Sequence, residues 1–130
     1  YFSKVFSKAQ EEGLTPYERL KELAMRAEEI FVFEEGGDFL VNIGLETKNS
    51  VSSFAKEIKD FFQEWITTMK LLYAFVLPDE EAQEKAEAIV AEIEGSVLMM
   101  KLLDDVNYLH RTHERLLKEY KELENAKIYK

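Results

Sequence analysis

Residues 79–103 can form a helix that is apolar on two opposite faces. At 3.6 residues per turn, the first face consists of Ala82, Ala86, Ile89, Val90, Ile93, Val97 and Met100. The second face consists of Ala88, Ala91, Gly95, Leu98, Met99 and Leu102. A helix on the surface of a monomer needs only one such face, so we expect one face in the core and the other at a subunit interface. The pattern leaves open a central helix that is buried on all sides within one chain.

The second face begins with small residues, Ala88, Ala91 and Gly95. Glycine in a helix interior costs roughly 0.5–1 kcal/mol relative to alanine, so its presence calls for a reason. Small side chains let the backbone of another helix come close. We therefore expect close helix packing at Gly95.

The composition narrows the class of protein. A chain of 130 residues predicts one domain. The formal net charge of −9 argues against nucleic-acid binding by this chain as given. The absence of cysteine excludes disulfides, a thiol nucleophile and cysteine-based zinc sites. No apolar run is long enough to span a membrane, so we expect a soluble, cytoplasmic protein without membrane partners.

The apolar periodicity predicts an all-α antiparallel bundle of about six helices and no sheet, because no segment shows sustained period-two alternation. The second helix has the clearest start, with Thr15 as N-cap, Pro16 at the first helical position and Glu18 able to complete a capping box. Pro78 ends the fourth helix, and Asp79 is expected to cap the fifth. The expected helices cover residues 1–12, 16–33, 39–47, 51–77, 79–103 and 106–123.

Two histidines, His110 and His113, lie on adjacent parts of one helical face. A di-iron carboxylate bundle needs glutamate three residues before each histidine, whereas Asn107 precedes His110 at that spacing. We therefore expect histidines at a helix interface and no metal. The paired carboxylates lie in solvated positions, and neither a phosphate-binding loop nor a nucleophile elbow is present. The sequence predicts no enzyme and no cofactor.

Aromatic and sulfur-containing side chains concentrate on three successive expected helices with few polar groups among them, the usual composition of a small-molecule pocket. The alternative is that these rings are simply core. The candidate effector pocket consists of Phe31, Phe33, Phe39, Asn42, Phe62, Trp65, Met69, Tyr73 and Met100.

Three stretches, taken in order, resemble the C-terminal ligand-binding and dimerisation domain of TetR-family transcriptional regulators of bacteria. GGDFLVNIGLE, residues 36–46, is similar to a short helix of that family, with matches at Gly37, Asn42 and Glu46 and departures at Asp38 and Val41. FAKEIKDFFQEW, residues 54–65, is similar to the long helix that often carries a Phe-Phe-x-x-Trp pattern. AEAIVAEIEGSVLMMKLLDD, residues 86–105, is similar to the penultimate helix.

The resemblance implies a single body domain over residues 1–130 whose N-terminal helix-turn-helix head is missing. Residues 1–12 would then be the end of the helix that connects head and body, in keeping with the Tyr1 start. Residues 79–124 would form a four-helix bundle with a second copy, making a homodimer. The last helix would contribute its apolar stripe to this interface, namely Leu109, His113, Leu116, Leu117 and Tyr120.

The function implied is that of a repressor body in which a small apolar or aromatic effector changes operator binding by the missing head. An alternative of another class is a stand-alone helical interaction module, which uses the two-faced helix to bind a partner and has no effector.

Overall fold

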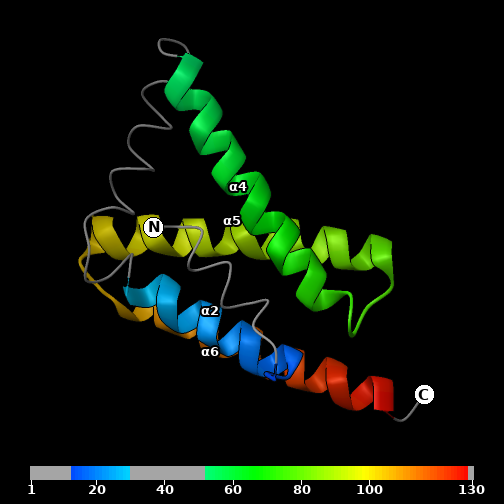
Figure 1. Ribbon diagram of the computed structural model, residues 1–130. Helices are drawn as coiled ribbons and strands as arrows, with labels where there is room; N and C mark the ends of the chain where they lie inside the picture. Colours follow the sequence, from blue (N-terminus) through cyan, green and yellow to red (C-terminus); the bar gives the residue numbers. More distant parts are fainter. Residues whose placement is uncertain (1–12, 30–51, 129–130) are drawn as a thin grey trace.

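The computed structural model describes residues 13–29 and 52–128, and every structural statement here concerns these ranges. They contain four helices and no strand: α2 (Pro16–Glu28), α4 (Ser52–Tyr73), α5 (Asp79–Leu103) and α6 (Asn107–Ile128) (Figure 1). The prediction of an all-α chain is confirmed. The helices expected at 1–12 and 39–47 lie outside the described residues.

The start of α2 forms as its sequence predicts. The Thr15 hydroxyl oxygen accepts a hydrogen bond of 3.1 Å from the backbone N–H of Glu18, and the same hydroxyl donates to the Glu18 carboxylate at 3.0 Å. Pro16 occupies the first turn, where no backbone N–H is needed. The two side chains therefore satisfy the helix start locally.

Three predicted boundaries were wrong. Helix α4 ends at Tyr73 rather than Leu77, because the residues before Pro78 form a turn. In this turn the backbone N–H of Leu77 donates to the Tyr73 carbonyl at 2.9 Å. The N-cap of α5 is Pro78, without a side-chain hydrogen bond, and Asp79 is the first helical residue. Helix α6 continues to Ile128, where the Lys127 ammonium donates to the Phe75 carbonyl.

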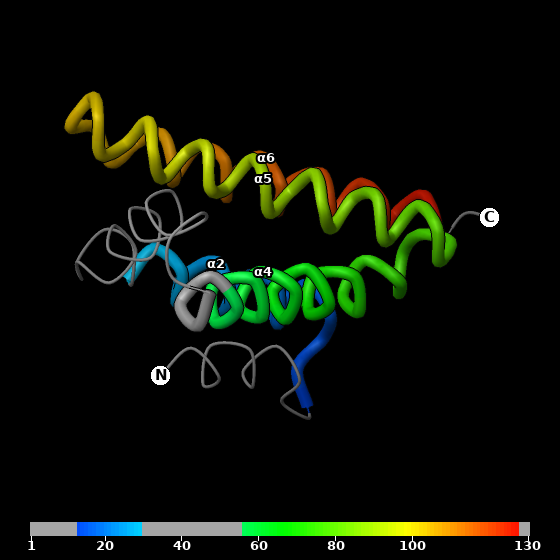
Figure 2. The backbone as a smooth tube through the Cα atoms, turned by 90° about the horizontal axis from the view of Figure 1, so that it is seen from above, coloured from blue at the N-terminus to red at the C-terminus, as the bar shows by residue number. Residues whose placement is uncertain are grey.

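The helices form two layers. Figure 2 shows α5 and α6 together in one layer and α2 and α4 in the other. Contacts join α4 to α5, α5 to α6, α6 to α2 and α2 to α4, so the four helices surround a common core. Asp104 ends α5 in a left-handed conformation, with φ of 51°, and α6 returns antiparallel to α5 (Figure 1).

The first face of α5 lies in the core, which confirms this part of the two-face interpretation. Its members are Ala82, Ala86, Ile89, Val90, Ile93, Val97 and Met100, all at most 4% exposed. They pack with Leu20 and Leu23 of α2, and with Trp65, Met69 and Leu72 of α4. No helix among the described residues is both long and apolar enough to cross a membrane.

Candidate functional site

The large side chains on the second face of α5 are exposed. Leu98 is 43% exposed, Met99 42% and Leu102 72%. Two further large apolar side chains at the end of α5 are exposed, Leu103 at 54% and Val106, which follows the helix, at 55%. We refer to the exposed residues on this side of the helix as the exposed α5 face: Ala88, Ala91, Gly95, Leu98, Met99, Leu102 and Leu103.

Gly95 lies in the middle of this face, and a Cβ atom built there would meet no heavy atom within 4 Å. The described part of the chain therefore gives no packing reason for glycine at this position. The alternative that α5 is buried on all sides by its own chain therefore has no support among the described residues.

The predicted contribution of α6 to the interface requires correction. Leu109 and Tyr120 are 0% exposed, His113 is 3% and Leu116 is 4%, while Leu117 is partly buried against the core. The physical reason is that α6 has a single apolar stripe, which packs against α2 and α5 of its own chain. This stripe leaves almost no surface for a second copy.

The buried contact between α5 and α6 includes one polar pair. The hydroxyls of Ser96 and Thr112 lie 2.6 Å apart, and both residues are buried. Ion pairs run along the outside of the same contact, between Lys85 and Glu119 at 2.5 Å and between Glu92 and Arg115. These contacts fix α6 beside the exposed α5 face.

The described members of the candidate effector pocket lie on α4, except for Met100, which lies on α5. Trp65, Met69, Tyr73 and Met100 are at most 3% exposed, and they belong to the hydrophobic core. Phe62 is partly buried, and its ring stacks on Trp65 with centroids 6.0 Å apart. The remaining predicted members lie outside the described residues: Phe31, Phe33, Phe39 and Asn42.

Phe61 also packs against Phe62 and Trp65, although it is not among the predicted pocket residues. Its ring lies 5.5 Å from Phe62 and 5.9 Å from Trp65, measured between centroids. The signal was present in the sequence, since Phe61 and Trp65 are four residues apart and share a helical face.

Two buried side-chain atoms of the described residues have no hydrogen-bond partner, Tyr73 Oη and His113 Nε2. Burial raises the pKa of the Tyr73 hydroxyl, so this group is a neutral phenol at any ordinary pH. The neighbouring Tyr120 differs, because its hydroxyl donates to the Leu72 carbonyl at 2.7 Å. The Tyr120 hydroxyl is thus satisfied, whereas the Tyr73 hydroxyl and the Nε2 atom of His113 have no partner among the described residues.

The last turn of α2 meets the histidines of α6. Glu28 Oε1 lies 3.1 Å from His113 Nδ1 and 3.3 Å from His110 Nδ1. His110 Nε2 lies 2.7 Å from a Glu114 carboxylate oxygen. The hydrogen bond from His113 lowers the pKa of Glu28. The prediction of histidines at a helix interface therefore agrees with the structure.

Glu28 was not found from the sequence, because it is 85 residues from His113 and no local pattern links the two. No group of three or more histidine, cysteine, aspartate or glutamate side chains within 13–29 and 52–128 has the arrangement needed to hold a metal ion. The Glu28 cluster is thus a hydrogen-bonded contact between helices.

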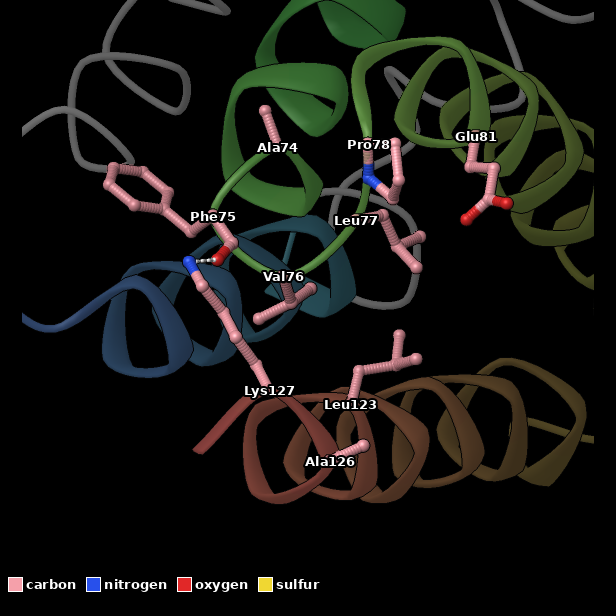
Figure 3. A pocket seen from close by; sticks show the side chains of 9 residues that line it. All are labelled: Ala74, Phe75, Val76, Leu77, Pro78, Glu81, Leu123, Ala126 and Lys127. Atoms are coloured by element: carbon pink, nitrogen blue, oxygen red, sulfur yellow. Dashed lines mark hydrogen bonds between the residues drawn. The ribbon is translucent and has the colours of Figure 1, made fainter. Parts of the chain in front are cut away.

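A surface groove of about 490 Å³ lies at the opposite end of α6, between its last turns and the turn from α4 to α5. In Figure 3 the side chains of Val76, Leu77 and Leu123 converge on it, and Lys127 reaches to the Phe75 carbonyl. None of the predicted effector-pocket residues lines this groove.

The sequence of these helices also matches a known protein family. Residues 16–115 match the family model of the C-terminal domain of LmrA/YxaF-like transcriptional regulators. The chain belongs to this TetR-type family. The matched range includes α2, α4, α5 and the first turns of α6. The family is one of regulatory, non-enzymatic domains. No curated protein and no solved structure matches the chain.

Proposed function

We propose that this TetR-type domain is the dimerisation and effector-binding body of a transcriptional repressor. The observation that carries the proposal is the exposed α5 face, which combines large apolar side chains with Ala88, Ala91 and Gly95. Removing apolar surface from water contributes roughly 25 cal/mol per Å², so a strip of this kind favours association.

A second copy is the occupant that best fits this strip. In a twofold dimer the same surface is used by both subunits, so a self-complementary apolar strip is sufficient. The open space above Gly95 lets two α5 backbones come close. Arg115 and Glu119 of α6, which already pair with α5, would form the polar edge of the interface.

The proposed effector site is the aromatic cluster of α4 and α5, completed by Phe31, Phe33, Phe39 and Asn42. Supporting this, the rings of Phe62 and Trp65 stack and Met69 lies in the same core. A small apolar or aromatic effector bound there would favour one arrangement of the domain. In the full-length dimer this would change operator binding by an N-terminal helix-turn-helix domain.

Sedimentation of the protein at micromolar concentration tests the dimer. Wild type is expected to sediment as a dimer, and Gly95→Leu as a largely monomeric protein. Because a Cβ at Gly95 meets nothing in its own chain, and leucine is the better helix former, this variant is expected to keep its fold.

The matched control is Gln63→Leu, which adds the same side chain at an exposed position of α4. It is expected to remain dimeric. A monomeric wild type, or a Gly95→Leu variant that associates as wild type does, would overturn the proposed interface. Wild-type monomers would also favour the alternative of a helical module that binds a different protein through the exposed α5 face.

A further inference from the structure

The thioether of Met99 is an oxidisable group in the middle of the exposed α5 face. Met99 follows Gly95 by four residues and precedes Leu102 by three, so the three residues lie on one side of the helix. Met99 is 42% exposed. Its sulfur is therefore open to a small oxidant in the single chain, because access is one of the conditions of oxidation.

The chain has four methionines, and their exposure differs sharply. Met69 and Met100 lie in the core at 2% and 3% exposure, whereas Met25 on α2 is 52% exposed. Met99 and Met100 are neighbours in the sequence but lie on different sides of α5, one exposed and one buried. Figure 2 shows α2 and α5 in different layers, so the two exposed methionines, Met25 and Met99, belong to separate parts of the molecule.

Methionine has little competition for an oxidant in this chain. Cysteine thiolates react readily with peroxides, and the sequence contains no cysteine. The ring of Trp65 is shielded, since this residue is 3% exposed. Oxidation by a peroxide is therefore directed to Met25 and Met99.

The reaction changes the polarity of the side chain. The sulfur of methionine attacks one oxygen of hydrogen peroxide, so that an S–O bond forms and the O–O bond breaks. The other oxygen leaves as water with both hydrogens, the sulfur loses two electrons, and the peroxide gains them. The sulfoxide oxygen is a hydrogen-bond acceptor, and its burial against apolar side chains without a donor is unfavourable.

We propose that Met99 is an oxidation site that controls association of the chain through the exposed α5 face. A hydroperoxide converts Met99 to the sulfoxide in the free chain, and the oxidised chain pairs only weakly with a second copy. A twofold dimer contains this residue twice, so each interface carries the cost of two sulfoxides. The inference rests on the proposed dimer and adds regulation to the same surface.

Association and oxidation then oppose each other. A second copy seated on the exposed α5 face covers Met99 and protects its sulfur, whereas Met25 stays exposed in both states. Oxidation of the free chain removes it from the equilibrium and draws the dimer apart by mass action.

Treatment with hydrogen peroxide, followed by peptide mass spectrometry and sedimentation, tests the proposal. Met25 and Met99 are expected to gain oxygen before Met69 and Met100. The dissociation constant of the dimer is expected to rise about tenfold or more, because two acceptors are buried without donors. A higher protein concentration should slow oxidation of Met99 and leave that of Met25 unchanged. Reduction by methionine sulfoxide reductases for both epimers should restore the dimer.

Met99→Leu removes the sulfur and keeps an apolar side chain of similar volume, so this variant should remain dimeric after peroxide. Its matched control is Met25→Leu, which removes the other exposed sulfur and should dissociate after peroxide as wild type does. Met99→Gln places a polar group at the same position and should weaken the dimer without any oxidant. Both positions are exposed, so the variants are expected to keep their fold.

Three results would overturn the proposal. A wild-type dimer that persists after Met99 is fully oxidised refutes the control of association. Equal dissociation of wild type and Met99→Leu by peroxide assigns the effect to another residue. Oxidation of Met99 no faster than that of Met100 refutes the access on which the site depends. An untreated wild type that is already monomeric refutes the proposed dimer itself, so the two failures are distinguishable.

Discussion

The paired rings of Tyr73 and Tyr120 allow a test in which the same substitution has opposite effects. The rings pack edge to face with centroids 5.1 Å apart, and both residues are 0% exposed. Tyr120 donates its hydroxyl to the Leu72 carbonyl, whereas the Tyr73 hydroxyl is buried without a partner. Replacement of either residue by phenylalanine removes one oxygen and keeps the ring.

The two hydroxyls should contribute to stability with opposite signs. An unpaired buried hydroxyl costs roughly 1–3 kcal/mol, so Tyr73→Phe is expected to raise the free energy of unfolding by about 1 kcal/mol. A satisfied hydrogen bond contributes roughly 0.5–1.5 kcal/mol, so Tyr120→Phe is expected to lower it by about 1 kcal/mol. The Leu72 carbonyl keeps only a weak bond from Phe75 N at 3.4 Å.

Urea and thermal unfolding of the three proteins would measure these changes. An entropy of unfolding of about 2.1 cal/mol/K per residue makes 1 kcal/mol equal to roughly 4 °C in Tm for a chain of this length. Protomer concentration must be equal in all experiments, because association raises the apparent stability. Destabilisation by both substitutions would show that the Tyr73 hydroxyl has a partner, which contradicts the reasoning.

Two further predictions concern other buried polar groups. Ser96→Ala should lower the free energy of unfolding by roughly 1–3 kcal/mol, because it leaves the Thr112 hydroxyl unpaired. The double variant Ser96→Ala with Thr112→Val should lose less stability than the two single variants added together. Additive losses in urea unfolding would contradict this coupling. Burial raises the pKa of the Glu94 carboxyl from 4.5 to about 7. Between these two pH values the folded protein keeps a proton on Glu94 that the unfolded chain releases, so the free energy of unfolding should fall by up to about 3 kcal/mol as the pH rises from 4.5 to 7. Glu94→Gln should flatten this part of the pH profile, and an unchanged slope in the variant would assign the pH dependence to other groups.

Local structure could be predicted where neighbouring residues decide it. Thr15, Pro16 and Glu18 form their helix start within four residues, and the predicted cap is present. Predictions of helix ends were less accurate. The turn before Pro78 and the added length of α6 depend on contacts between residues far apart, such as Lys127 with Phe75.

The pocket illustrates a second limit of sequence reasoning. Helical spacing placed Phe62, Trp65 and Met69 on one face, and the structure packs them together. Spacing within a helix gave no information about Glu28, which reaches the histidines only after α2 packs against α6. The contact between Glu28 and the histidines is therefore set by the fold.

By itself, the sequence determined which faces of the helices are apolar, because burial of apolar surface requires a periodicity that the residue order records directly. For α5 it also separated two faces, of which the Ile93 side lies in the core and the Gly95 side is exposed. What covers an apolar face is decided only by tertiary structure. The α6 stripe from Leu109 to Tyr120 has the periodicity expected of an interface, yet it is buried within its own chain, because α2 and α5 of the same chain pack against it.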